Sequence, residues 1–214
     1  MSPSFYPEPA NAKIDDLRQL PIVQSVLEEL RSKLPPNLKY HCAKHTDNVL
    51  SEVVYFAVTD GLPEREIHLL AVAAAYHDAG FLIRIPDNEE LGAEMAEKAM
   101  RAAKGYSQQE IRLVKDMIMD TKLKDSGVDY KKRPSSELSK YLLDADLSNL
   151  GREDFFARLE QLHQEMGGDP ELHLHNSYRL LKNHHWLTPA ATAAREECKQ
   201  RNLAKLAERI GAPV

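Results

Sequence analysis

Two histidines stand four residues apart in the stretch 36-PNLKYHCAKHTDNVL-50, near the expected start of a helix. His41 and His45 could bind a metal ion through their imidazole nitrogens, or one of them could transfer a proton near neutral pH. Alternatively, both are core histidines whose nitrogens are hydrogen-bonded to neighbouring groups. The choice depends on whether the chain carries further ligands at spacings that a fold can bring together.

A second candidate lies in 71-AVAAAYHDAG-80, where His77 and Asp78 close a segment that is apolar nearly all round. An unpaired buried carboxylate costs several kcal/mol, so such groups are paired, exposed or bound to a metal. From the residues alone, Asp78 could instead face water near the helix end, and His77 could be a core histidine bonded to a carbonyl. Adjacent residues point about 100° apart on a helix. A metal that both residues share must therefore lie beside the helix, with its other ligands on different helices.

A third candidate is 141-YLLDADLSNLG-151, where Asp144 and Asp146 stand among leucines. Aspartates in such a place also serve as helix-end or capping residues. A set of two histidines and two aspartates would suit Fe, Mn, Zn, Ni or Mg, and it would leave coordination positions open for water and substrate.

The elements that must position these residues are predicted to be helices. Only 9 glycines occur, and apolar residues recur at intervals of three and four rather than two. We expect a single all-α domain of eight or nine helices over residues 13–214, preceded by a loosely ordered arm at 1–12 and interrupted by a long polar loop at 122–136. The helices are expected at 14–34, 41–59, 64–80, 89–104, 107–120, 136–149, 152–166, 170–186 and 190–210.

Composition excludes several classes of function. The chain has 214 residues and a net charge of −5 with interspersed signs, which is not typical of a nucleic-acid-binding protein. Its one basic run, Lys131 to Arg133, fits a solvated loop beside Pro134. No apolar run approaches the ~20 residues that span a bilayer. The two cysteines, Cys42 and Cys198, suggest no disulfide framework. We therefore expect a cytoplasmic protein with no membrane or nucleic-acid partner. The sequence leaves the oligomeric state open, with a homodimer among the options.

Taken together, these motifs resemble those of the HD superfamily of metal-dependent phosphohydrolases. An early histidine, an apolar run ending in His-Asp and a late Asp-Ala-Asp-Leu occur in an all-helical chain, and the resemblance covers about residues 38–190. The segments 40-YHCAKH-45, 73-AAAYHD-78 and 145-ADLSNL-150 are similar to matching segments of cyclic-nucleotide phosphodiesterases. The stretches 105-GYSQQEI-111 and 184-HHWLTPAA-191 are similar to small bacterial HD hydrolases. The resemblance implies a helical bundle of the HD-domain and phosphodiesterase type.

The resemblance also implies a ligand set. His45, His77 and Asp78 would be the first three metal ligands. Asp146, which follows a small residue and precedes Leu-Ser, matches the fourth ligand better than Asp144 does, although helical phase alone does not separate the two. Many relatives hold a second metal with further histidines, and this chain lacks them in the corresponding region, 87-DNEELGAE-94.

The chemistry implied is the hydrolysis of a small phosphate mono- or diester of a nucleotide-like substrate by a metal-bound hydroxide. Asp78 would also accept a proton from the attacking water, and His41 matches the general acid that protonates the leaving oxygen. The charged residues expected to contact substrate are Lys44, Arg84, Glu89 and Lys122. The chain has Ala79, Gly80 and Phe81 where several relatives carry an acidic residue, so a catalytically weak module that binds a nucleotide or metal for regulation is the alternative.

Overall fold

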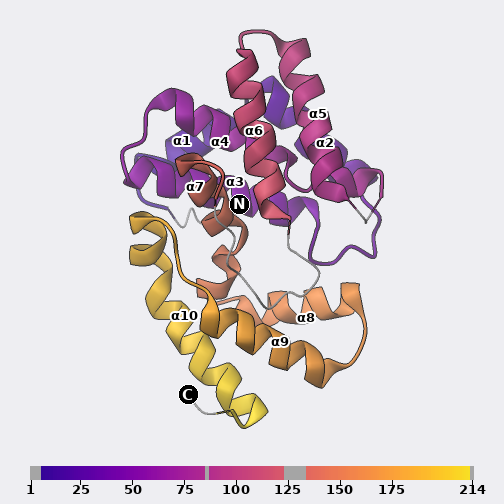
Figure 1. Cartoon of the computed structure of the whole chain (residues 1–214), viewed down its shortest axis with the longest axis vertical. Coiled ribbons are helices and arrows are strands. Elements are labelled where there is room, and N and C mark those ends of the chain that lie inside the picture. Colours follow the sequence, from indigo (N-terminus) through magenta and orange to yellow (C-terminus); the bar gives the residue numbers. More distant parts are fainter. Residues whose placement is uncertain (1–5, 85–86, 123–133, 213–214) are drawn as a thin grey trace.

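The computed structural model is a bundle of helices (Figure 1). It describes residues 6–84, 87–122 and 134–212, and within these ranges it contains ten α-helices, two short 3-10 helices and no strand. The prediction of an all-α fold is confirmed. The elements are α1 (Ala10–Arg18), α2 (Pro21–Lys33), α3 (Ala43–Thr59), α4 (Glu64–Tyr76), η1 (Ala79–Leu82), α5 (Asn88–Ala103), α6 (Gln108–Thr121), α7 (Glu137–Asp146), η2 (Ser148–Gly151), α8 (Phe155–Met166), α9 (Pro170–Asn183) and α10 (Pro189–Ile210).

The first predicted helix, 14–34, is two helices. Pro21 is the first residue of α2, and the chain turns between Arg18 and Pro21. Proline cannot continue a helix, because it has no N–H to donate and its ring clashes with the preceding turn. The apolar stripe of α2 is buried: Ile22, Val23, Val26, Leu27 and Leu30.

Within the N-terminal arm predicted over residues 1–12, Tyr6 and Ala10 contact the rest of the chain, whereas residues 7–9 are exposed. Tyr6 lies against Tyr55, with ring centroids 5.1 Å apart, and its hydroxyl donates to Glu52 at 3.1 Å. Helix α1 begins at Ala10, whose side chain is buried. Residues 1–5 lie outside the described residues, as do the basic run Lys131 to Arg133 and most of the predicted loop 122–136.

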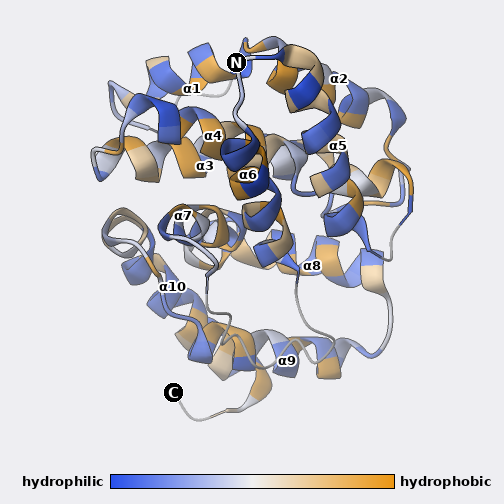
Figure 2. Ribbon diagram, turned by 45° about the horizontal axis from the view of Figure 1, so that its top comes forward, coloured by the Kyte–Doolittle hydropathy of each residue, from blue (hydrophilic) through white to orange (hydrophobic). Residues whose placement is uncertain are grey.

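Two apolar clusters form the interior. The larger lies among α1 to α7 and surrounds α4, the helix predicted to be central, and Figure 2 shows apolar residues gathered on α3 and α4 in the middle of this part. The smaller cluster joins η2 to α8, α9 and α10 through Leu150, Phe155, Leu181 and Leu206. These last three helices lie together on one side of the larger bundle (Figure 1). In the described ranges, each helix is too short or too polar to cross a bilayer.

A buried ion pair ties α10 to the larger cluster. Glu52 of α3 is 1% exposed and accepts hydrogen bonds from Arg195 of α10 at 2.6 and 2.8 Å. The same carboxylate accepts the Tyr6 hydroxyl. Removing one member of such a pair would leave the other charge buried without a partner, so this contact holds α10 in a defined position against α3.

A glycine allows α5 to approach the end of α4 closely. A Cβ atom at Gly92 would lie 2.4 Å from the carbonyl oxygen of Tyr76 and 3.1 Å from that of His77. Both distances are shorter than ordinary contacts, so the approach requires a residue without a side chain. Gly92 therefore allows α5 to pack against the C-terminal end of α4, where the His-Asp motif begins.

We predict that Gly92→Ala lowers the free energy of unfolding by about 1–3 kcal/mol, the usual cost of overpacking a core. Urea denaturation followed by circular dichroism would measure the change. The control is Glu94→Ala on the exposed side of the same helix, which should alter stability by less than about 0.5 kcal/mol. Equal stability of Gly92→Ala and the unmodified protein would show that α5 does not need this close contact.

Candidate metal centre

Four side chains from three separate segments converge at the ends of helices. His45 lies in the first turn of α3, His77 and Asp78 directly follow α4, and Asp146 is the last residue of α7. His45 Nε2 lies 3.2 Å from Asp146 Oδ1 and 3.5 Å from Asp78 Oδ2. His77 Nε2 lies 3.2 Å from Asp78 Oδ2 and 3.5 Å from Asp146 Oδ1. The structure thus brings together all four residues that the sequence predicted as ligands.

The tautomer of His77 directs a lone pair into this cluster. Its Nδ1 lies 2.7 Å from the carbonyl oxygen of Ala74 and must donate to it, because a carbonyl only accepts. In the neutral ring, Nε2 is then an acceptor facing the two carboxylates. A histidine held in this way by a backbone carbonyl is the usual arrangement of a metal ligand.

The cluster contains two buried polar atoms that have no hydrogen-bond partner. His77 Nε2 and Asp78 Oδ2 are both fully buried and make no hydrogen bond, although they lie 3.2 Å apart. The buried carboxylate and the Nε2 lone pair would repel each other in the neutral ring, and a cation between them removes that cost. These two atoms therefore fit a metal site.

The spacing of the donors also fits one ion. Donor atoms of His45, His77 and Asp146 all lie within 4.8 Å of one another, close to the span that bonds of about 2.0–2.2 Å to a single ion allow. Among the described residues, this group could hold a metal ion. Asp78 would add a second carboxylate oxygen.

His77 and Asp146 of this cluster both have strongly shifted pKa values. Burial acts to lower the pKa of His77, but Asp78 and Asp146 overcome this effect and raise it well above its ordinary value. Burial acts to raise the pKa of Asp146, but the hydrogen bond from His45 and the nearby imidazole of His77 hold it far below its ordinary value. Negative charge is thus retained at the point where the donors converge.

Asp144, the other acidic candidate, has a structural position. Its carboxylate accepts hydrogen bonds from the backbone N–H groups of Leu187 and Thr188, at 2.9 and 2.8 Å, and from the Thr188 hydroxyl at 2.7 Å. Thr188 in turn caps the N-terminus of α10. Burial raises the pKa of Asp144 to about 6, against the effect of these hydrogen bonds. Asp144 therefore fastens the start of α10, and Asp146 is the aspartate that faces the centre.

His41 lies beside the centre and is held by a residue that sequence reasoning missed. Its ring stacks on Phe81, with centroids 4.7 Å apart, and its Nδ1 makes a short hydrogen bond to Glu165 of α8. The same carboxylate accepts the backbone N–H groups of Tyr40 and His41 at 2.9 and 3.1 Å. Burial acts to lower the pKa of His41, but the hydrogen bond to Glu165 raises it above its ordinary value. Nε2 is the ring nitrogen left for other chemistry.

The residues predicted to contact substrate are less closely tied to the centre. Lys44 is exposed in the first turn of α3, and Arg84 is exposed with Asp87 at 3.6 Å. Lys122 pairs with Glu90 at 2.5 Å. Burial raises the pKa of Glu89, and the charge of Asp78 acts in the same direction. Contact of these four side chains with substrate stays a prediction.

No local signal in the sequence points to Glu165. It is 124 residues from His41, in the amphipathic helix 155-FFARLEQLHQEM-166. The pattern of that helix predicts only a charged residue on its polar face. The sequence singles out Phe81 only as one of three residues at which several HD relatives carry an acidic residue.

A family-model scan finds no match to this chain, and a search of curated proteins likewise finds none.

We predict opposite behaviour for the two aspartates of the Asp-Ala-Asp segment. Asp146→Asn should weaken Mn²⁺ binding by at least tenfold, because a negatively charged ligand is lost. Asp144→Asn should retain Mn²⁺ affinity and lower stability by about 1–3 kcal/mol, because buried N–H groups lose a carboxylate acceptor.

Isothermal titration with Mn²⁺ and urea denaturation in the presence of a chelator would measure these two quantities separately. Each variant serves as the control for the other. Loss of metal affinity in Asp144→Asn with Asp146→Asn unaffected would reverse the assignment.

Proposed function

We propose that the protein is a metal-dependent phosphohydrolase that cleaves a small phosphate mono- or diester. The observation that carries the proposal is the joint placement of two features. His45, His77, Asp78 and Asp146 converge with unpaired buried donor atoms, and His41 stands next to them in contact with a carboxylate. The similarity of the three sequence motifs to those of the HD superfamily supports the same function.

The two imidazoles and two carboxylates would hold one divalent ion, and this donor set suits Mn, Fe, Ni, Zn or Mg. When bound, such an ion lowers the pKa of a coordinated water and neutralises charge that builds on phosphoryl oxygens. Asp78 would also accept a proton from the attacking water, since its carboxylate lies at the convergence point. His77, fixed through Ala74, keeps the geometry of the site constant during the reaction.

His41 would protonate the leaving oxygen. A general acid must be protonated at the working pH and must reach the atom that receives the proton. Glu165 meets the first requirement by raising the pKa of His41, and it meets the second by occupying Nδ1 and leaving Nε2 for the substrate. Phe81 restricts rotation of the ring by stacking on it.

We predict that the Mn²⁺-loaded protein hydrolyses p-nitrophenyl phosphate, bis(p-nitrophenyl) phosphate or both, and that His77→Ala loses both the ion and the activity. Release of p-nitrophenolate measures turnover with Mn²⁺, Ni²⁺ or Mg²⁺, and elemental analysis measures bound metal. Circular dichroism should show that the helical content of His77→Ala survives. Full turnover by a His77→Ala protein that holds no metal would contradict the mechanism, and a metal-loaded protein with no turnover of any ester would contradict the function.

We predict that Glu165→Gln lowers kcat by roughly 10–100-fold while Mn²⁺ affinity is unchanged, because the general acid loses its orienting carboxylate but every ligand remains. The variant loses the charge that raises the pKa of His41, so His41 deprotonates at lower pH. Activity needs the protonated ring, and the alkaline limb of the pH–kcat profile should therefore move to lower pH.

The leaving group provides the control for this prediction. His41→Ala and Glu165→Gln should slow an alkyl phosphate ester more than a p-nitrophenyl ester, because p-nitrophenolate leaves without a proton whereas an alkoxide needs one. Equal slowing of both esters, or loss of metal from either variant, would show that this pair does not act as the general acid.

A further inference from the structure

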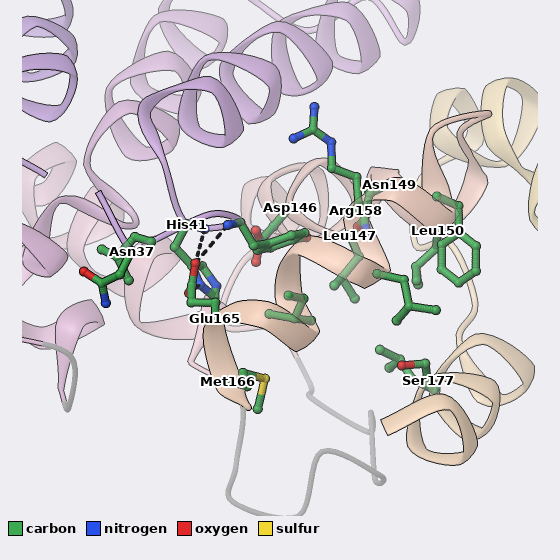
Figure 3. Close-up of a pocket in the computed structure, with 16 residues that line it drawn as sticks. Asn37, His41, Asp146, Leu147, Asn149, Leu150, Arg158, Glu165, Met166 and Ser177 are labelled. Atoms are coloured by element: carbon green, nitrogen blue, oxygen red, sulfur yellow. Dashed lines mark hydrogen bonds and ion pairs between the residues drawn. The ribbon is translucent and has the colours of Figure 1, made fainter. Parts of the chain in front are cut away.

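A cavity of about 560 Å³ opens beside the candidate metal centre, a volume typical of small-molecule sites. His41 and Asp146 border it, so it is continuous with the proposed reaction site. Eight of its sixteen lining residues have aliphatic or Phe side chains: Leu38, Leu147, Leu150, Phe155, Leu159, Leu162, Met166 and Leu180. Figure 3 shows His41, Glu165 and Asp146 close together and Leu150 well away from them.

The charged side chains of the cavity already have partners. Those of His41 and Glu165 bond to each other, and Asp146 belongs to the metal centre. The fourth, Arg158, donates to Asp154 at 3.0 Å and to Gln161 at 2.9 Å, and its guanidinium extends away from the leucines in Figure 3. Four neutral polar side chains complete the lining: Asn37, Tyr40, Asn149 and Ser177. The cavity is therefore poorly suited to a second phosphate group.

The chemistry of the lining defines what it can accept. Apolar surface transferred from water into such a cavity gains free energy in proportion to its area, whereas hydroxyl and amide groups lose water and must find new partners. The cavity begins next to His41, the residue proposed to protonate the leaving oxygen. The group that enters it is thus the one attached to that oxygen.

We propose that this cavity binds the apolar leaving group of the substrate, so that the preferred substrate is the phosphate ester of an alkyl or aryl alcohol rather than a nucleotide. This inference rests on the proposed function, since it takes the phosphorus to be at the metal centre. It replaces the nucleotide-like substrate expected from the sequence by one of a different chemical class.

Binding of n-alkylphosphonates, which are not hydrolysed, tests the cavity without reference to turnover. Isothermal titration of the Mn²⁺-loaded protein with methyl-, butyl- and octylphosphonate, below the concentrations at which they form micelles, should show affinity rising by up to about fourfold for each added methylene. We expect octylphosphonate to bind at least tenfold more tightly than butylphosphonate and more tightly than adenosine monophosphate. Affinity independent of chain length, or tighter binding of the nucleotide, would overturn the proposal.

Variants of the lining test the location. Leu162→Asn should reduce the preference for octyl- over methylphosphonate at least tenfold, and Leu162→Trp should lower octylphosphonate affinity while leaving methylphosphonate affinity unchanged, because the indole fills the space. Leu162 is partly exposed, which favours folding of both variants. The control is Leu172→Asn, at a residue 58% exposed and outside the lining, which should retain the full preference. An unchanged preference in both Leu162 variants would overturn the assignment to this cavity.

Release of inorganic phosphate from methyl and octyl phosphate separates this inference from the proposed function. Chain-length-dependent binding without phosphate release from any ester would uphold the cavity and overturn the phosphohydrolase. Release at equal efficiency from both esters, with chain-length-independent binding, would uphold the phosphohydrolase and overturn the cavity as its leaving-group site.

Discussion

The candidate metal centre depends on compensation of the negative charge of two carboxylates, Asp78 and Asp146, that lie beside two imidazoles. Two carboxylates and two imidazoles lie within a few ångströms of one another. His45, His77 and Asp78 are buried, Asp146 is 21% exposed, and two of the atoms in the cluster have no hydrogen-bond partner. Burying such a cluster is costly unless opposite charge compensates it. Asp78 and Asp146 raise the pKa of His77, so a proton on this imidazole can supply part of the opposite charge. A divalent cation would compensate the same charge without using a proton.

The fold places one helix start and two helix ends around this cluster. The ligands stand at the first turn of α3, at the end of α4 and at the last residue of α7, where the backbone can change direction and bring side chains from different helices to one place. Gly92 lets α5 pack on the carbonyl groups that precede the His-Asp motif. Asp144, two residues before Asp146 on α7, accepts a hydrogen bond from the backbone N–H of Thr188, the N-cap residue of α10. Glu165 of α8 is hydrogen-bonded to His41. The centre therefore lies where the larger bundle meets the C-terminal helices.

Much of this arrangement is local enough to be predicted from the sequence. Periodicity of the apolar residues predicts the helices, and an aspartate closing an apolar helix indicates that His77 and Asp78 need a partner. The prediction of one helix over residues 14–34 overlooks Pro21, which excludes a continuous helix across that point. Glu165 could not be predicted, since its role depends on a contact 124 residues distant, and the apolar cavity depends on how η2, α8 and α9 pack. Distinguishing Asp146 from Asp144 needed the resemblance, because helical phase does not separate them and only the packing of α10 shows what Asp144 does.

The most direct test of this account is anomalous X-ray diffraction from crystals of the full chain grown with Mn²⁺. The account predicts one strong anomalous peak about 2.0–2.3 Å from His45 Nε2, His77 Nε2 and one carboxylate oxygen each of Asp78 and Asp146, with His41 Nε2 facing the open side. An ordered structure with Mn²⁺ bound elsewhere, or with these four side chains bonded only to one another at saturating Mn²⁺, would contradict it.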